Sequence, residues 1–444
     1  MEYTLEWLMK NDGFTCDCGK KHYGLLKDCV IGENALARVP EMVRKYNGTH
    51  PFVLCDQDTY AAAGEQVCTL LDHAQIPYTL HIISRKKPAP DERIVGEAVM
   101  FCDQKCDIVI AVGGGVINDT GKIVANLKGC TDIYVATAPS MDGYASGSSS
   151  MERTGLKVSL TTKCPDVVIG DADVLAAAPV HMIRSGIGDM AAKYISIVEW
   201  QIAALLIGEA YCPTVAKIVK ESLAVCVKHA KAAVAGDKEA VCRLAEGLVM
   251  SGLAMNYAGI SRPASGMEHY ISHILDMRAL EFGTPADLHG IQCGIGTLIT
   301  AQGYEKLAQI KPDREKALAF VQQFDREEWF AHLRTLLGHG AEAIIAGEQK
   351  EGKYDPAKHA ARLEKILANW DEILKIAAQL PSSAQLREFF VSIGHPVSGL
   401  ELGLTEADMR EAFLAAKDIR DKYVLGRLFW DLGELDAVAD SMNW

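Results

Sequence analysis

Four residues in the middle of the chain are of types that bind metal ions or move protons. His269 and His273 stand four positions apart, which places them on one face if that segment is helical. Asp189 follows two nearby glycines, and His289 stands directly before another segment with helical spacing. One aspartate with two histidines is a common ligand set for a catalytic divalent ion, because three protein ligands leave a position open for substrate.

The spacing of these four residues leaves other interpretations open. Asp189 could cap a helix, and each histidine could be an ordinary core or surface residue. If a metal does bind, carboxylate and imidazole ligands suit zinc, iron or nickel, and the spacing does not choose among them. Such an ion would polarise a hydroxyl group and stabilise an alkoxide.

A second motif, at residues 108–122, joins an apolar run to three glycines and a helical pattern. The run at residues 108–112 is typical of a buried parallel strand, and Gly113, Gly114 and Gly115 end it. Glycines let the backbone approach a pyrophosphate closely, and the N–H groups of the following helical turn could bind it. The pattern, Gly-Gly-Gly-x-x-x-Asp119-x-x-Lys122, differs from the usual G-x-G-x-x-G fingerprint, so a tight turn without a ligand is the alternative.

The elements that must position these motifs fall into two classes. Strand-like runs alternate with helical patterns early in the chain, at residues 28–32, 51–55, 78–83, 108–112 and 133–137. This alternation predicts a parallel, doubly wound sheet. Residues 157–160 and 167–171 look like a strand pair or edge strands, and helical patterns dominate from about residue 174. We therefore predict an α/β domain at residues 1–173 and an all-α domain at residues 174–444.

Ligands of a doubly wound sheet bind at the carboxyl ends of its strands. Three polar features are expected at such ends: Asp56, the glycine loop and the loop at residues 137–142. Asp56 could accept a hydrogen bond from a ribose hydroxyl and so favour NAD over NADP. An ordinary acidic turn residue is the alternative.

Charge and composition narrow the class of partner. The 444-residue chain carries a net charge of −13 and has no long basic run, which argues against nucleic acid and anionic membranes as partners. We find neither a signal-peptide pattern nor a membrane-spanning run, so a cytoplasmic location with reduced thiols is expected for the 13 cysteines. Cys16, Cys18 and His22 could form half of a zinc site, but no second cysteine pair follows, and a structural metal is not expected there.

The motifs together resemble the superfamily of iron-containing alcohol dehydrogenases and dehydroquinate synthase, and within it the bacterial glycerol-1-phosphate dehydrogenases. The resemblance rests on the glycine motif, the loop Thr137-Ala-Pro-Ser-Met-Asp-Gly-Tyr-Ala-Ser146, Gly188-Asp-x-x-Ala-Lys193, Arg262-Pro-Ala-Ser-Gly-x-Glu-His-x-x-Ser-His273 and His289-Gly290. It implies a nucleotide-binding domain followed by a helical one, and reduction of dihydroxyacetone phosphate to sn-glycerol 1-phosphate by NADH or NADPH, with the reverse reaction.

The resemblance also implies roles for individual residues. Asp189, His269 and His289 would hold one divalent metal, with zinc favoured over nickel or iron. His273 and Asp142 would contact the substrate, as would Asp189. For the substrate phosphate we expect Arg262 and the turn at Ser265 and Gly266, with Lys193 as a weaker candidate. With Asp56, the expected dinucleotide contacts are Gly113, Gly114, Gly115, Val116, Ile117, Asn118, Asp119, Thr137, Ser140 and Ser146.

Three other functions fit parts of the same pattern. A glycerol or polyol dehydrogenase would lack selection for phosphate, and a lyase of the dehydroquinate synthase type would need a cluster of basic residues near the metal. A catalytically silent sensor would not need Asp189, His269 and His289. A homodimer is expected from the resemblance, and the charged residues 311–375 could be an insertion or a dimer surface.

Overall fold

The computed structural model describes residues 3–10, 13–154 and 156–444. It divides into two compact units. Unit 1 consists of Met1–Met190 with Thr214–Ile260, and unit 2 consists of Ala191–Pro213 with Ser261–Trp444.

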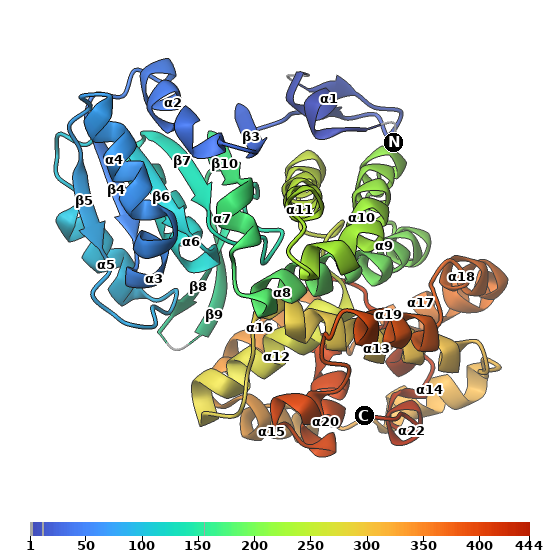
Figure 1. Ribbon diagram of the computed structural model, residues 1–444. Coiled ribbons are helices and arrows are strands. Elements are labelled where there is room, and N and C mark those ends of the chain that lie inside the picture. The colour runs from blue at the N-terminus through green and yellow to red at the C-terminus, as the bar shows by residue number, and fades with distance from the viewer. Residues whose placement is uncertain (1–2, 11–12, 155) are drawn as a thin grey trace. The chain divides into compact units, whose positions relative to one another are not determined.

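A six-stranded parallel sheet forms the centre of unit 1 (Figure 1). Its strands lie in the order β3 (Asp28–Gly32), β10 (Val167–Asp171), β7 (Thr131–Ala136), β6 (Ile108–Gly113), β4 (Pro51–Cys55) and β5 (Thr79–Ile82). The parallel α/β prediction is confirmed, because β4 and β6 are buried apolar runs joined by helical crossovers.

Helices cover both faces of this sheet. On one face, η1 (Ala35–Arg38), α2 (Val39–Lys45) and α4 (Glu65–His73) share a core with alternate residues of the strands, including Val53, Ile110 and Ile133. On the other face lies α6 (Gly115–Lys128), with α5 (Glu92–Phe101) beside it. After Asp56, the chain between β4 and α4 is helical, as α3 (Gln57–Thr59) and η2 (Tyr60–Gly64).

The prediction of an edge or paired strand at residues 167–171 is wrong. β10 hydrogen-bonds to both β3 and β7, and all five of its residues are buried. A short apolar run does not by itself distinguish an edge strand from an interior one. Residues 157–160 do belong to a strand pair, since β9 (Leu156–Thr161) lies antiparallel to β8 (Ser148–Arg153).

Four further helices belong to unit 1: α7 (Ala172–Ala176), α8 (Val180–Ala191), α10 (Pro213–Val234) and α11 (Lys238–Ala258). The predicted boundary at residues 173 and 174 lies inside α7, shortly after the last strand ends at Asp171. The compact unit reaches further because α11 packs against α7 and β3.

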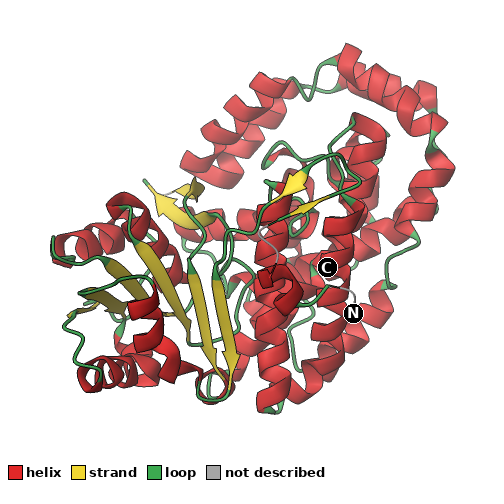
Figure 2. Ribbon diagram, turned by 90° about the horizontal axis from the view of Figure 1, so that it is seen from above, coloured by secondary structure: helices red, strands yellow, loops and turns green. Residues whose placement is uncertain are grey.

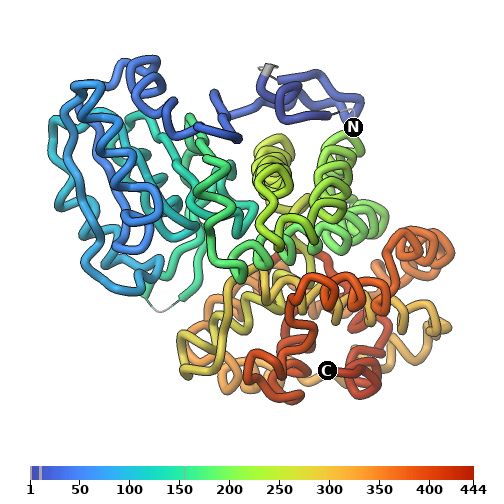
Figure 3. The backbone as a smooth tube through the Cα atoms, viewed as in Figure 1, coloured from blue at the N-terminus to red at the C-terminus, as the bar shows by residue number. Residues whose placement is uncertain are grey.

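The N-terminal segment also belongs to unit 1 and lies beside α10 and α11 (Figure 3). It contains α1 (Leu5–Lys10), β1 (Phe14–Thr15) and β2 (Lys21–His22). The backbone N–H of Tyr3 donates to Glu221 on α10, and the Phe14 ring lies 5.5 Å from the ring of Tyr257 on α11.

Unit 2 is built from helices throughout its described residues (Figure 2). The longer ones are α9 (Lys193–Ile207), α12 (Met267–Phe282), α13 (His289–Leu307), α14 (Arg314–Gln323), α15 (Arg326–Leu337), α16 (Ala341–Glu351), α17 (Pro356–Ala368), α18 (Trp370–Ala377), α19 (Ser383–Ser392), α20 (Glu406–Ala415), α21 (Leu425–Asp431) and α22 (Leu435–Asp440). Short 3-10 turns are η3 (Gly338–Gly340), η4 (Gly399–Leu402) and η5 (Ala416–Asp418). α12 and α13 pack against each other.

One helical stretch of the described residues, Val180–Ile207, is long and apolar enough to cross a membrane by length and composition. Its most apolar window is 72% buried within the protein, as in the core helix of a globular protein.

Candidate functional site

The glycine loop of unit 1 joins the end of β6 to the start of α6. Gly114 is the N-terminal cap residue of this 14-residue helix, and no side chain caps it. The N–H groups of its first turn therefore lack a side-chain partner at the carboxyl edge of the sheet. Such a helix N-terminus can receive a phosphate group.

Close packing explains why glycines stand here. A Cβ atom at Gly115 would lie 2.9 Å from Cε of Met141, and one at Gly121 would lie 2.5 Å from Cβ of Ala111. Glycine therefore lets α6 approach both β6 and the loop that follows β7.

Asp119 and Lys122 of the same motif point into the protein. The carboxylate of Asp119 accepts the backbone N–H of Ser150 at 3.0 Å and lies 3.3 Å from Nζ of Lys122. Nζ of Lys122 donates to the carbonyl oxygens of Gly143 at 2.6 Å and Ser148 at 3.1 Å. Burial raises the pKa of Asp119. The carboxylate of Asp119, an expected dinucleotide contact, thus ties α6 to the following loop and hairpin.

The other predicted dinucleotide contacts lie at the carboxyl edge of the sheet or directly behind it. Gly114, Gly115 and Val116 are partly exposed, whereas Ile117 and Asn118 are buried in the first turns of α6. The N–H of Thr137 donates to the carbonyl of Gly113. The hydroxyl of Ser146 donates to backbone carbonyls of its own loop, at Gly143 and Ser148.

Asp56 follows β4, the neighbour of β6, so it lies at the same edge of the sheet. Its Oδ1 atom accepts the N–H of Thr59 at 2.8 Å and thereby caps α3. If Asp56 also accepts a hydrogen bond from a ribose hydroxyl, the same carboxylate serves both the ribose and the capping of α3.

The loop after β7 is held between α8 and α11. A Cβ atom at Gly186 of α8 would lie 1.9 Å from the carbonyl oxygen of Pro139. The Ser185 hydroxyl donates to the carbonyl of Ser140 at 2.9 Å. On α11, a Cβ atom at Gly252 would lie 2.8 Å from the carbonyl oxygen of Asp142. Small residues on both helices therefore fix the position of this loop.

The same contacts bring Asp142 and Asp189 together. The backbone N–H of Asp142 donates to Oδ2 of Asp189 at 2.9 Å, and Asp189 is fully buried. The hydroxyl of Ser251 donates to Oδ2 of Asp142 at 2.8 Å. Two carboxylates that the sequence separates by 47 positions thus lie at one place in unit 1.

Unit 2 brings three histidines together where α12 meets the start of α13. The ring centroid of His289 lies 5.0 Å from that of His269 and 5.8 Å from that of His273. His269 and His273 lie one turn apart on α12, with ring centroids separated by 6.4 Å. His269 and His273, on one face of α12, therefore meet His289 where α12 packs against α13.

The imidazole of His269 is oriented by its neighbour in the chain. Its Nδ1 atom lies 2.9 Å from Oε1 of Glu268, which also accepts the N–H of Gly266 at 2.7 Å. Burial, together with the positive charge of Lys193, holds the pKa of His269 well below its usual range. Burial and the carboxylate of Glu199 raise the pKa of Glu268. With Nδ1 facing Glu268, the neutral ring can offer Nε2 to a ligand.

Sequence reasoning missed one residue of this cluster, Cys293. Its Sγ atom lies 3.5 Å from Nε2 of His289, and ligand atoms of His269, His289 and Cys293 lie within 4.8 Å of one another. The available signal was its spacing, because Cys293 follows His289 by one helical turn.

Arg262, the predicted phosphate contact, is fully buried. It donates to the carbonyl oxygens of Glu199 and Tyr423, and its Nε lies 3.3 Å from a carboxylate oxygen of Glu209. This placement favours a structural role. Besides burial, the positive charges of two lysines, Lys193 and Lys422, lower the pKa of His269. Burial lowers the pKa of Lys422 to about 7.

The sequence model for the family described as iron-containing alcohol dehydrogenase matches residues 30–179. Among solved structures, the chain resembles glycerol dehydrogenase from Schizosaccharomyces pombe, with a TM-score of 0.60 and 17% identity over 94% of this chain and 90% of that one. It also resembles a 1,3-propanediol oxidoreductase, with a TM-score of 0.61 and 16% identity over 94% of this chain and all of that one. These likenesses show the fold.

Relatives in sequence are more specific. The chain is 30% identical to glycerol-1-phosphate dehydrogenase [NAD(P)+] of Halalkalibacterium halodurans, over 92% of this chain and 94% of that protein. It is 32% identical to the archaeal protein of the same name from Archaeoglobus fulgidus, over 65% of this chain and 82% of that protein. The chain therefore belongs to the glycerol-1-phosphate dehydrogenases of the iron-containing alcohol dehydrogenase family.

Proposed function

We propose that this protein reduces dihydroxyacetone phosphate to sn-glycerol 1-phosphate with NADH or NADPH, and catalyses the reverse reaction, using one divalent metal held by Asp189, His269 and His289. The observation that carries the proposal is the convergence of His269, His273 and His289, with Nδ1 of His269 held by Glu268. The printed names of the relatives supply the substrate and the cofactor.

The donor set fits a catalytic metal. A buried carboxylate and two imidazoles match the ligands of catalytic zinc sites, and nickel or iron would suit them as well. The Glu268–His269 contact has the form of a carboxylate that orients a metal-bound histidine. A bound divalent ion would supply Lewis acidity at the substrate carbonyl.

The glycine loop fits a dinucleotide. The uncapped first turn of α6 would bind the pyrophosphate, and a side chain at Gly115 would meet Met141. Asp56, at the end of the neighbouring strand, is proposed to accept from a ribose hydroxyl. A nicotinamide cofactor would supply the hydride.

The chain's own residues would then bind and orient the ketone. Asp142, itself fixed by Ser251, would accept hydrogen bonds from the substrate hydroxyl. His273 would contact the substrate and donate the proton that the product oxygen takes up. We assign attraction of the substrate phosphate to Lys193 and Lys422. Nζ of Lys422 donates to the carbonyl oxygen of Ser265, four residues before His269, and, besides burial, the charges of both lysines lower the pKa of His269.

We also propose a cytoplasmic homodimer. None of the 13 cysteines forms a disulfide, which suits a reducing compartment. Light scattering on the purified protein would test the dimer.

The proposal is tested by oxidation of NADH and NADPH with dihydroxyacetone phosphate beside unphosphorylated dihydroxyacetone, on metal-stripped protein refilled with Zn²⁺, Ni²⁺ or Fe²⁺. We expect metal-restored turnover that strongly prefers the phosphorylated ketone. Equal turnover on both ketones would indicate a polyol dehydrogenase instead. Absence of turnover on either would contradict the dehydrogenase function.

A further inference from the structure

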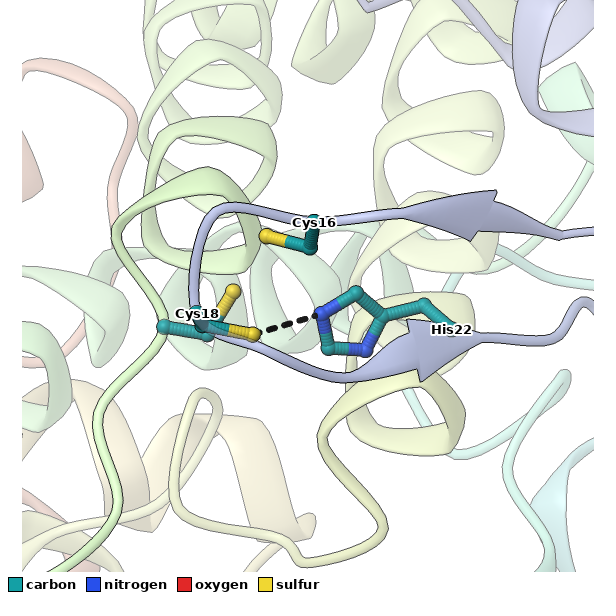
Figure 4. A group of neighbouring side chains, drawn as sticks. Cys16, Cys18 and His22 are labelled. Carbon is teal, nitrogen blue, oxygen red and sulfur yellow. Dashed lines mark hydrogen bonds between the residues drawn. The ribbon is translucent and has the colours of Figure 1, made fainter.

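The N-terminal hairpin brings three metal-binding side chains together. β1 and β2 pair antiparallel, with Phe14 opposite His22. In the turn between them, the N–H of Gly19 donates to the carbonyl of Cys16 at 2.9 Å. Gly19 has a φ of +82°, which favours glycine. This tight turn places ligand atoms of Cys16, Cys18 and His22 within 4.8 Å of one another (Figure 4).

The histidine of this group is held in the state that a metal requires. Its Nδ1 atom lies 2.6 Å from the carbonyl oxygen of Tyr257 on α11. Because a carbonyl oxygen can only accept, Nδ1 carries the proton and Nε2 presents its lone pair. A metal-bound histidine typically donates its other N–H to such a carbonyl or to a carboxylate. His22 is 2% exposed, so this arrangement is shielded from water.

Nε2 of His22 points toward a thiol at a distance that suits a shared ion. It lies 3.3 Å from Sγ of Cys18 (Figure 4). In a tetrahedral zinc site with Zn–S of about 2.3 Å and Zn–N of about 2.0 Å, the two ligand atoms lie about 3.5 Å apart. A small outward movement of the Cys18 side chain would therefore admit the ion.

A candidate fourth ligand stands directly before α10 in the sequence. Sγ of Cys16 lies 3.4 Å from the hydroxyl of Thr214, near the start of α10. Cys212 stands two residues before Thr214. We propose that Cys16, Cys18, His22 and Cys212 bind a structural zinc ion. This site is separate from the metal under the proposed function and does not depend on it.

Three thiolates and one imidazole make a closed zinc site. Such a site has four protein ligands and no open position for substrate, so its role is to stabilise structure. The exposed Lys20 and Lys21 offset the negative charge that three thiolates and one Zn²⁺ leave. The ion would fasten the hairpin to α10 and α11, which the N-terminal segment also contacts through Phe14 and Tyr3.

The site is tested by counting zinc in protein purified with a reducing agent and without chelators. Asp189→Asn serves as the parent variant because it weakens the other proposed metal site. We expect Asp189→Asn/Cys18→Ser to contain one zinc fewer than Asp189→Asn/Cys102→Ser, since Cys102 is a partly exposed thiol outside the group. Equal zinc contents would overturn the proposal and leave Cys18 and His22 as a hydrogen-bonded pair.

A measurement on the unmodified protein keeps the test decisive if Cys18→Ser does not fold. X-ray absorption at the zinc edge is expected to show sulfur ligands at about 2.3 Å. Cobalt-substituted protein is expected to show thiolate-to-cobalt charge-transfer absorption. Cys102→Ser should keep both signals. A zinc shell of nitrogen and oxygen alone, or protein that holds no zinc, would contradict the proposal.

Discussion

The Nδ1 atom of His269 lies 2.9 Å from a carboxylate oxygen of Glu268, the residue directly before it in the chain. The contact fixes the ring and its tautomer without using a distant part of the fold. Because Glu268 is fully buried, its side chain has few alternative partners, and the orientation of His269 depends on it.

Glu268→Gln is therefore expected to weaken binding of the activity-linked metal. Loss of a carboxylate behind a metal-bound histidine lowers metal affinity by about 10- to 100-fold. The measurement is the free metal concentration that gives half-maximal NADH oxidation in a chelator-buffered assay. Glu281→Gln, on the same helix but paired with the exposed His339, is the matched control. A wild-type metal dependence in Glu268→Gln would contradict this role.

Gly186→Ala is expected to disturb the dinucleotide site. The added Cβ would meet the carbonyl oxygen of Pro139 at 1.9 Å, so α8 or the loop must move. Overpacking of this kind destabilises a protein by about 1–3 kcal/mol, and we expect the KM for NADH to rise as well. Gly96→Ala in α5, where nothing lies within 4 Å, should instead be neutral or stabilising by up to about 1 kcal/mol. Urea unfolding compares the two, and equal effects would refute the packing argument.

Lys122→Met should destabilise unit 1. It leaves the buried carboxylate of Asp119 without its cation and removes donors to Gly143 and Ser148. Breaking a buried ion pair from one side costs about 3–5 kcal/mol. The double variant Asp119→Asn/Lys122→Met should lose less than the sum of the single variants, as measured by urea unfolding. A loss below about 1 kcal/mol in Lys122→Met would show that the pair does not hold the loop.

Asp132 predicts a pH dependence of stability. Its two carboxylate oxygens are buried without a hydrogen-bond partner, and burial raises its pKa to about 7. Between its unfolded pKa of about 4 and pH 7, the folded state holds a proton that the unfolded chain has released. The free energy of unfolding therefore falls as the pH rises through this window, on the order of 1.4 kcal/mol per unit of pKa difference.

Asp132→Asn should remove this slope. Relative to wild type, the variant is expected to gain a few kcal/mol of stability between pH 5 and pH 8, measured by urea unfolding at both values. Asp58→Asn, at an exposed position of α3, should keep the wild-type slope. If Asp132→Asn and wild type show the same slope, Asp132 does not titrate as described.

Local sequence patterns predict much of this architecture. The apolar runs of β4 and β6, and the glycines between β6 and α6, were predictable because each depends on neighbours in the sequence. The two histidines on α12 were also predictable, since helical spacing alone places them on one face.

Contacts between distant segments were not predictable in the same way. Single-sequence reasoning could not foresee that α11 packs on β3, nor that Lys122 reaches Gly143 rather than solvent. Sequence reasoning does not predict a metal at the Cys16–Cys18–His22 group, because no second cysteine pair follows it. The structure shows instead that a backbone carbonyl from α11 orients His22.

The most direct test of the proposed function is a metal titration of stripped protein, followed by NADH oxidation with dihydroxyacetone phosphate. We predict that wild-type activity rises from near zero to a plateau as Zn²⁺ is added. Asp189→Asn should stay inactive at metal concentrations that saturate the wild type, because a ligand of the activity-linked ion is missing. Full activity in stripped wild-type protein, or a wild-type titration curve in Asp189→Asn, would contradict the metal-dependent mechanism.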